Sequence, residues 1–337
     1  MQESRRAILI TGSGRSGTTV CMYFLECLGA FMSPEMIEAS PQNPDGGRED
    51  KQIFSLHQSL LRALHTTTYL PLPLGWQKED VTKRIASQIG AIVDQRVEEA
   101  ASKIWAIKDP NLSLFLPIWI RLFNAKKILP HHILCVRHPE AVARSMEAQY
   151  GQSRSMSMTM WLLRNCYTLV NTGGNCLVLH YEGWEQDILK QLRALCRFCG
   201  FTLRRSDKEL MEKISAVYRP VLNRTGDSID LREIDNPHVS RLYDALLAVG
   251  QGEMAGRAAV RVAQECLKQF EHFRGLSDSA QEAIQALSNQ KKLAEQRAQT
   301  SVTSDNSLDS LKTDIDDVRK ELRSLKAGLR LALKNEN

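Results

Sequence analysis

The segment at residues 7–19 constrains the fold more than any other part of the chain. Residues 7–10 form an apolar run that is too short for a helix and is typical of a buried strand. A glycine-rich loop follows from Gly12 to Gly17, and beyond it apolar residues recur at helical spacing as far as Leu28. A strand, a glycine loop and a helix in this order direct backbone N–H groups and a helix N-terminus toward one point. The segment therefore predicts an anion site.

The two glycines of this loop have the spacing of a P-loop, but Thr18 replaces the lysine that normally follows the second one. That lysine contacts the β- and γ-phosphates of a nucleoside triphosphate. Here the basic residue is Arg15, inside the turn. The loop thus favours a smaller and less charged group than a triphosphate. The alternative is a tight turn between strand and helix that binds no ligand.

The composition restricts the class of ligand. Of the 337 residues, 43% are hydrophobic and 25% are charged, which is ordinary for a globular protein of one large or two small domains. Lys and Arg number 44 against 39 Asp and Glu, so the formal net charge is +5. This excess fits an anionic ligand, but no long basic run or aromatic ladder indicates nucleic acid.

The sequence predicts a cytoplasmic protein. Residues 1–6 are too short and polar for a signal peptide, and no apolar run approaches the length of a membrane span. The eight cysteines are scattered singly, apart from Cys196 and Cys199, whose C-x-x-C spacing lacks a second pair. We expect buried, reduced thiols, with a metal site or a disulfide as the alternative.

Apolar segments of strand character alternate with helical patterns along the first two thirds of the chain. Strands are expected at 7–10, 103–108, 132–137 and 175–181. Helices are expected at 50–65, 81–101, 112–123, 139–148, 156–170, 184–199 and 207–217. This alternation predicts an α/β fold with a parallel sheet and helices on both faces. Ligands bind beyond the carboxyl ends of such strands, where this chain places Arg15, Lys108, Arg137 and Tyr181.

Beyond residue 237 the chain is almost wholly helical, with a polar break at 299–307. After the break, apolar residues step by three and four over three heptads, which predicts a short coiled coil and a homo-oligomer. They are Leu308, Leu311, Ile315, Val318, Leu322, Leu325 and Leu329. The alternative is a single amphipathic helix that packs on the protein body. We expect an α/β domain at 1–236, a helical extension at 237–298, and a linker with the coiled-coil segment at 299–337.

Two motifs of the α/β domain resemble those of sulfotransferases that use 3′-phosphoadenosine 5′-phosphosulfate (PAPS). The sequence GRSGTT at 14–19 is similar to the family's 5′-phosphosulfate loop, and RHPEAVARS at 137–145 is similar to its 3′-phosphate motif. The resemblance extends over residues 6–226, is to the bacterial, Golgi-like carbohydrate and tyrosylprotein branch, and implies a P-loop-like three-layer core. It assigns Gly14, Arg15, Ser16, Gly17, Thr18 and Thr19 to the 5′ side of the cofactor, and Arg137 and Ser145 to its 3′-phosphate.

The spacing within the second motif has a physical reason. Arg137 ends a predicted strand, and Ser145 lies two turns into the following helix, so both can face one oxyanion. The guanidinium fork suits a phosphate bidentately. The alternative for Arg137 is a salt bridge at the start of the helix.

Two other segments resemble family elements that carry the chemistry. Lys108 begins a Lys-Asp-Pro element, whose lysine contacts the transferred group in the family and can neutralise charge on the bridging oxygen. Glu49 ends an Asn-Pro-x-Gly-x-x-Glu segment at 43–49 and is the expected catalytic base. The two residues before it replace an aromatic pair that many members have, which leaves the register open. Asp50 is therefore an alternative base, and Arg48 an alternative contact for an anionic acceptor.

Further residues near these motifs are candidates with weaker support. Tyr181 and Glu182 resemble a Tyr-Glu pair at a late strand end of the family, where the tyrosine borders the nucleotide and the glutamate orients an arginine. Arg219 and Arg224 lie in a segment that weakly resembles one that closes over the cofactor.

Three side chains have simpler structural explanations. His57 and His65 are rival bases, but their spacing in an amphipathic helix favours solvated or structural histidines. Trp161 is expected to serve the core rather than the site.

Together these features predict an enzyme that transfers the sulfuryl group of PAPS in line to an acceptor hydroxyl, with Glu49, Lys108 and Arg15 as catalytic residues. By analogy with the branch, the expected acceptor is a carbohydrate. No metal is expected, because a sulfuryl group carries less charge than a phosphoryl group. The alternatives are a P-loop kinase for a small molecule, which needs a triphosphate and Mg²⁺, and a non-catalytic nucleotide-binding scaffold that acts through its coiled coil.

Overall fold

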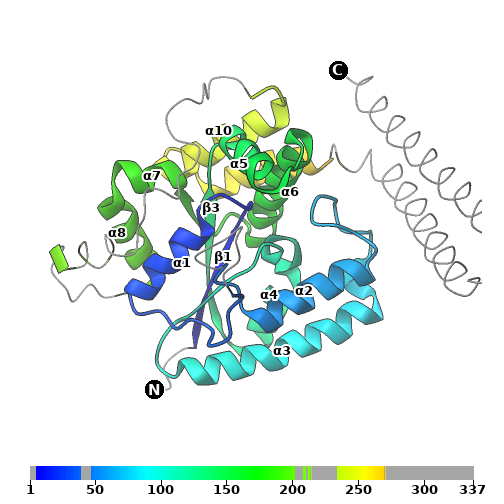
Figure 1. Ribbon diagram of the computed structural model, residues 1–337, viewed down its shortest axis with the longest axis vertical. Coiled ribbons are helices and arrows are strands. Elements are labelled where there is room, and N and C mark those ends of the chain that lie inside the picture. The colour runs from blue at the N-terminus through cyan, green and yellow to red at the C-terminus, as the bar shows by residue number, and fades with distance from the viewer. Residues whose placement is uncertain are drawn as a thin grey trace, which may run out of the picture. The chain divides into compact units, whose positions relative to one another are not determined.

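The described part of the chain is built around a four-stranded parallel sheet (Figure 1). Its strands are β1 (Arg6–Gly12), β2 (Trp105–Lys108), β3 (Leu129–Val136) and β4 (Leu177–His180), in the spatial order β2-β1-β3-β4. The computed structural model describes residues 5–38, 47–201 and 234–268, and the isolated positions 208, 209, 212, 214 and 270. The α/β fold with a parallel sheet flanked by helices is confirmed.

Helices connect and cover the strands. They are α1 (Thr18–Cys27), α2 (Lys51–Ala63), α3 (Asp80–Ala100), α4 (Leu112–Lys126), α5 (Pro139–Tyr150), α6 (Arg154–Thr172), α7 (Tyr181–Gln186), α8 (Ile188–Cys199) and α10 (Pro237–Gln251). Side chains that accept from backbone N–H groups begin several of them, as Asp50 does for α2 and Asn236 for α10. Left-handed glycines such as Gly151 and Gly173 end α5 and α6.

The expected single helix at 184–199 is wrong. The chain breaks at Asp187, where φ is −154° and ψ is 81°, and the Asp187 carboxylate accepts a hydrogen bond of 2.9 Å from the backbone N–H of Lys190. Because this aspartate acts as an N-cap, it ends α7 and starts α8. The apolar periodicity of the segment contains no sign of this break.

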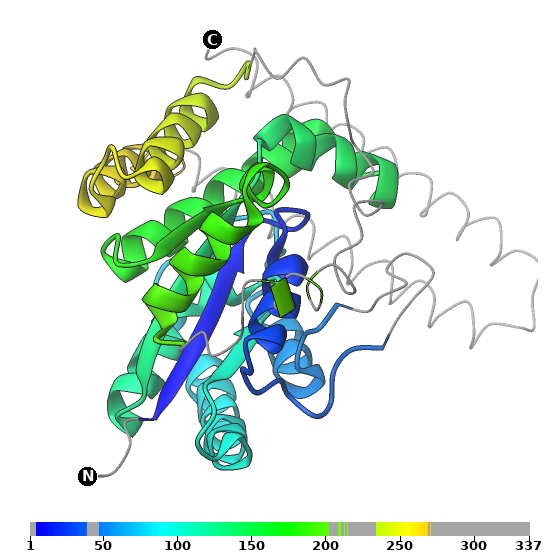
Figure 2. The same ribbon diagram turned by 90° about the vertical axis from the view of Figure 1, so that its left-hand side faces the viewer.

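Alternating side chains of β1 divide the core between the two faces of the sheet. Ala7 and Leu9 pack with α2, α3 and α4, whereas Ile8 and Ile10 pack with α1, α7 and α8. A third cluster covers β3 and β4 with α5, α6 and α10. Figure 2, turned by 90°, shows helices on either side of β1. The parallel strands are apolar on both faces, as a sheet covered on both sides requires.

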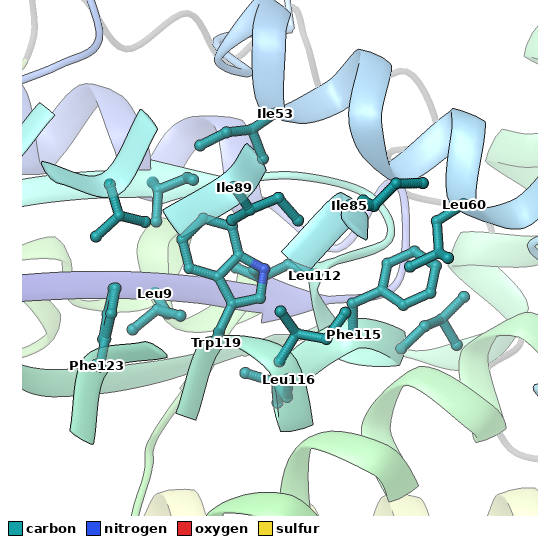
Figure 3. Close-up of a cluster of buried hydrophobic side chains, with 14 of the residues drawn as sticks. Leu9, Ile53, Leu60, Ile85, Ile89, Leu112, Phe115, Leu116, Trp119 and Phe123 are labelled. Atoms are coloured by element: carbon teal, nitrogen blue, oxygen red, sulfur yellow. The ribbon is translucent and has the colours of Figure 1, made fainter. Parts of the chain in front are cut away.

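Aromatic side chains of α4 fill the space between β1 and the pair α2 and α3. Trp119 and Phe115 are fully buried there, next to Leu9, Ile53 and Ile89 (Figure 3). Burying a large aromatic side chain is among the largest single apolar contributions to a core. This cluster fixes α2 and α4, and with them the residues at the carboxyl end of β2.

The described helical residues at 237–251 and 256–268 belong to the same compact unit as the sheet, which extends to Phe270. Val239, Leu242 and Leu246 of α10 pack against β4 and α6, and helical residues follow at 256–268. The coiled coil expected at 308–329 lies outside the described residues, as does most of the helix expected at 207–217. None of the helices that the structure describes is both long enough and apolar enough to cross a bilayer.

His132 on β3 predicts a pH dependence of stability. Burial, and secondarily the charge of His131, lower the pKa of His132 to about 4. The unfolded chain therefore binds more protons between about pH 6.5 and 4, so stability falls as the pH falls through this window. We expect wild type to lose about 2 kcal/mol more stability than His132→Gln between pH 7.5 and 5.0. Denaturant titrations at both pH values measure this difference, and equal losses would contradict it.

Candidate active site

The parallel register brings four strand ends to one edge of the sheet. Ile10 pairs with Lys108, Gly12 with Cys135, and Val136 with His180. The loop after β1, the last residue of β2 and the residues that follow β3 and β4 therefore lie next to one another. The sequence-predicted Arg15, Lys108, Arg137 and Tyr181 occupy these positions.

The loop between β1 and α1 has the properties of an anion cradle. Gly17, with φ of +87°, is the N-cap of α1, and no side chain caps this helix or places a carboxylate in its first turn. The hydroxyl oxygens of Ser13 and Ser16 are buried and have no hydrogen-bond partner in the structure. Thr18 and Thr19 form the start of the helix. An anionic group would satisfy these donors and the helix terminus together.

Arg15 joins the loop to the second predicted motif. Its Nε donates to Ser145 Oγ at 2.9 Å, although the two residues are 130 positions apart. Arg137 Nη1 donates to the carbonyl of Arg15 at 3.4 Å, and Trp161 Nε1 donates to the carbonyl of Arg137 at 3.0 Å. The contacts of Arg15 and Arg137 therefore join the two predicted motifs into one basic cluster, which α6 supports through Trp161.

Tyr181 lies between the two motifs. The Arg137 guanidinium lies 4.3 Å above its ring centre, a cation–π arrangement. The ring also faces Gly17, where an added Cβ would lie 2.6 Å from Cδ2 of Tyr181. The adjacent Glu182 accepts from the backbone N–H of His138 at 3.1 Å. Glu182 thus anchors the start of α5, beside Arg137.

Gly17→Ala is expected to lower the free energy of unfolding by about 1–3 kcal/mol, because alanine is strained at positive φ. The added methyl group should also push the Tyr181 ring away, and thereby weaken binding of an anionic nucleotide. Gly29→Ala is the matched control, because Gly29 has φ of +95° and open space around its Cβ position. Thermal unfolding and calorimetric titration with adenosine 3′,5′-bisphosphate separate the two effects. Unchanged affinity in Gly17→Ala would contradict the proposed contact with the ligand site.

Lys108 and Glu49 form a buried ion pair at the end of β2. Lys108 Nζ lies 2.5 Å from Glu49 Oε1 and 2.5 Å from the carbonyl oxygen of Gly47. The side chains are 7% and 8% exposed, respectively. The residues predicted as base and as transfer lysine are therefore in direct contact. An ammonium carries three N–H bonds, and two described groups accept from this one.

Asp50, the alternative base, has structural partners on both oxygens. Oδ1 accepts from the backbone N–H groups of Gln52 and Ile53, and Oδ2 accepts from Arg96 Nε at 2.7 Å. Both members of the Asp50–Arg96 pair are 1% exposed. This carboxylate caps α2 and ties it to α3, so both of its oxygens serve structural contacts.

His57, the rival base on α2, is fully buried. Its Nδ1 lies 2.8 Å from Asp109 Oδ1, and Trp119 Nε1 donates to its Nε2 at 3.1 Å. Because the indole N–H of Trp119 can only donate, Nε2 of His57 accepts, and Nδ1 is the nitrogen that faces the Asp109 carboxylate. The same Asp109 oxygen accepts from the backbone N–H of Asn111 at 2.6 Å. His57 thus fixes the turn that follows Lys108. His65, in contrast, is exposed in the turn that follows α2.

Arg164 of α6 also holds the turn that follows Lys108, a role that the sequence did not predict. Its Nη2 donates to Asn111 Oδ1 at 3.1 Å and also contacts Thr68 Oγ1. Burial lowers the pKa of Arg164 to about 10, against the opposing effect of Asp109, so the side chain stays charged at neutral pH. A single arginine in an amphipathic helix gives no sequence signal for such a contact.

Several sequence candidates cannot be placed. Arg219, Arg224 and residues 43–46 of the segment before Glu49 lie outside the described residues. Within the part of the chain that is described, no group of three or more His, Cys, Asp or Glu side chains is arranged to hold a metal ion. The eight cysteines all lie in this part and form no disulfide.

Comparisons with known proteins identify the class. Residues 7–205, more than half of the chain, match the sequence model of the Sulfotransferase family. The chain therefore belongs to this family and is a sulfotransferase-family enzyme, which implies a sulfuryl donor and an acceptor. No curated relative matches the sequence.

Solved structures of low similarity include several sulfotransferases. The sulfotransferase domain of the Synechococcus PCC 7002 olefin synthase is 18% identical, with a TM-score of 0.43, covering 79% of this chain and 96% of that domain. The sulfotransferase domain from the curacin biosynthetic pathway is 17% identical, with a TM-score of 0.41 and coverages of 79% and 98%. Sulfotransferase STF9 from Mycobacterium avium is 13% identical, with a TM-score of 0.39 and coverages of 79% and 77%.

Proposed function

We propose that this enzyme transfers the sulfuryl group of PAPS to a hydroxyl group of a carbohydrate. The observation that carries the proposal is the contact of Arg15 with Ser145, because it joins the loop after β1 to the motif after β3 in one basic cluster. PAPS carries one anionic group at its 5′ position and another at its 3′ position, so each of the two joined motifs would bind one of these groups. The carbohydrate acceptor rests on the likeness of residues 43–49 to the corresponding segment of the carbohydrate branch.

The proposed donor supplies, when bound, a sulfuryl group activated by a phosphate leaving group. Residues 14–19 would hold its 5′ side, where the orphaned Ser16 hydroxyl and the uncapped α1 terminus lie. Arg137 and Ser145 would hold its 3′-phosphate, with Tyr181 beside the nucleotide. Ser16, Arg137 and Ser145 are buried and belong to fixed elements of the fold, so the site would need little reorganisation when the ligand arrives.

Lys108 and Glu49 have complementary roles in the proposal. Lys108 would neutralise the negative charge that grows on the oxygen between phosphorus and sulfur as the S–O bond breaks. Glu49 would take the proton of the acceptor hydroxyl as the hydroxyl oxygen bonds to sulfur. Their contact of 2.5 Å supports the assignment, since base and charge-neutralising cation then flank the same point.

Calorimetric titration with adenosine 3′,5′-bisphosphate, and separately with ATP and Mg²⁺, tests the donor assignment. We expect tight binding of the bisphosphate without added metal. Binding of ATP with Mg²⁺ together with indifference to the bisphosphate would overturn the assignment and favour a kinase. Bisphosphate binding without any release of product from PAPS would favour the non-catalytic scaffold.

A further inference from the structure

The chain around Glu49 is firmly held on its C-terminal side. The carbonyl of Glu49 accepts from the backbone N–H of Ile37 at 2.9 Å, and Lys51 N–H donates to the carbonyl of Glu35 at 3.0 Å. Asp50 adds the cap of α2 and the buried pair with Arg96. These contacts fix the backbone that follows Glu49, but they do not determine where its side chain points.

The direction of the Glu49 side chain depends on a turn at Arg48. Arg48 has φ of +58°, in the left-handed region, which costs a non-glycine residue about 1 kcal/mol or more. The turn folds Gly47 beneath the Glu49 carboxylate, so closely that a Cβ on Gly47 would lie 1.6 Å from Oε2. As a result, the Gly47 carbonyl and Glu49 Oε1 both meet Lys108 Nζ at 2.5 Å.

The side chain of Arg48 is held by α1. Its guanidinium carbon lies 3.9 Å from the centre of the Tyr23 ring, and Nη1 lies 2.5 Å from Glu26 Oε2. The Arg48 side chain is 19% exposed and that of Glu26 is 46% exposed. An exposed ion pair alone contributes little, but a guanidinium that also stacks on an aromatic ring is fixed in one geometry.

We propose that Arg48 is a positioning residue, which holds the strained turn that directs Glu49 at Lys108. Arg48 connects this turn to α1, whose N-terminus is the proposed donor site. This positioning role takes the place of the role considered for Arg48 in the sequence analysis, a contact with an anionic acceptor. The proposal rests on the proposed function, because it assigns Glu49 the role of base. Arg48 acts through Glu49, since the side-chain partners of Arg48 are Tyr23 and Glu26, which belong neither to the proposed donor residues nor to the ion pair of Lys108.

Arg48→Gly is the decisive variant, because glycine adopts positive φ without strain and only the side-chain contacts are lost. Turnover is measured as release of adenosine 3′,5′-bisphosphate from PAPS with water as acceptor: a water oxygen bonds to sulfur, the S–O bond to phosphate breaks, and Glu49 takes the water proton. We expect a loss of about tenfold or more in kcat, with unchanged affinity for adenosine 3′,5′-bisphosphate. Arg48→Lys, which keeps the charge opposite Glu26, should recover part of the loss.

Two comparisons distinguish positioning from general stabilisation. Lys126→Ala removes an ion pair to Asp94 of the same 2.5 Å length and similar exposure, far from the turn in sequence, and should leave turnover unchanged. In a Glu49→Gln background, Arg48→Gly should cause no further loss, since its effect passes through the carboxylate. An equal loss in both backgrounds would overturn the proposal, whereas full activity of Glu49→Gln itself would instead refute the proposed base.

Amide hydrogen exchange tests the turn without any turnover. Arg48→Gly should accelerate exchange in a peptide covering residues 47–53 and leave a peptide covering residues 7–19 unchanged. Unchanged exchange at 47–53 would overturn the proposal, whatever the activity of the variant.

Discussion

Glu49→Gln is expected to lower turnover by about 10²- to 10⁴-fold while affinity for adenosine 3′,5′-bisphosphate stays nearly unchanged. The amide has the shape of the carboxylate and can still accept a hydrogen bond from Lys108, but it cannot take a proton from the acceptor. The proposed donor contacts come from the loop after β1 and from the residues after β3 and β4, whereas the Glu49 carboxylate pairs with Lys108 at the end of β2. The expected loss is therefore in kcat.

Release of the bisphosphate from PAPS measures turnover, and calorimetry measures affinity. Asp94→Asn is the matched control, since Asp94 also forms an ion pair of 2.5 Å with a lysine but on the exposed surface between α3 and α4. The control should retain full turnover. Wild-type turnover in Glu49→Gln would remove Glu49 from the role of base, and a parallel loss of bisphosphate affinity would indicate that the buried pair with Lys108 serves structure instead.

The sheet was accessible from sequence because parallel strands buried on both faces are continuous apolar runs. Residues 7–10 and 133–136 are of this kind, and each run lies within an observed strand. The residues at the strand ends followed directly, since parallel strands share one carboxyl edge. The strand pattern alone therefore locates Lys108 and Arg137 at this edge.

Contacts between elements were not accessible, because no local pattern encodes them. The hydrogen bond from Arg15 to Ser145 depends on how α5 leaves β3 relative to the loop after β1. His57 shows the same limit: its helical spacing favours a solvated or structural histidine, but its contacts with Asp109 and Trp119 could not be read from that spacing. The break at Asp187 was hidden because the apolar positions on either side still fit one helical period.

Arg48 illustrates why a departure from a family pattern is hard to interpret from one sequence. The pattern leads one to look for an aromatic pair before the glutamate, and an arginine there reads as a contact for an acceptor. The structure instead directs it to Tyr23 and Glu26, more than 20 residues earlier in the chain. The left-handed φ is equally invisible, since arginine has no preference for that region.

Arg137→Ala is expected to weaken binding of adenosine 3′,5′-bisphosphate by about 10- to 100-fold, the range for a lost hydrogen bond to a charged group. Adenosine 5′-monophosphate, which lacks the 3′-phosphate, should bind the variant and wild type with nearly equal affinity. Arg137 also contacts the carbonyl of Arg15 and the ring of Tyr181, and losing these contacts would affect both ligands. The difference between the two losses of affinity therefore measures the contact with the 3′-phosphate alone.

Arg121→Ala, which removes an exposed arginine of α4, is the control for net charge and should leave both affinities unchanged. Calorimetry at two salt concentrations separates a specific contact from general attraction, because screening weakens only the latter strongly. An equal loss for both ligands in Arg137→Ala would assign Arg137 to the structure of the loop. Unchanged affinity of Arg137→Ala for both ligands would show that the 3′-phosphate does not bind at Arg137. Because Arg137 and Ser145 are assigned to the same oxyanion, the nucleotide would then also have to bind elsewhere.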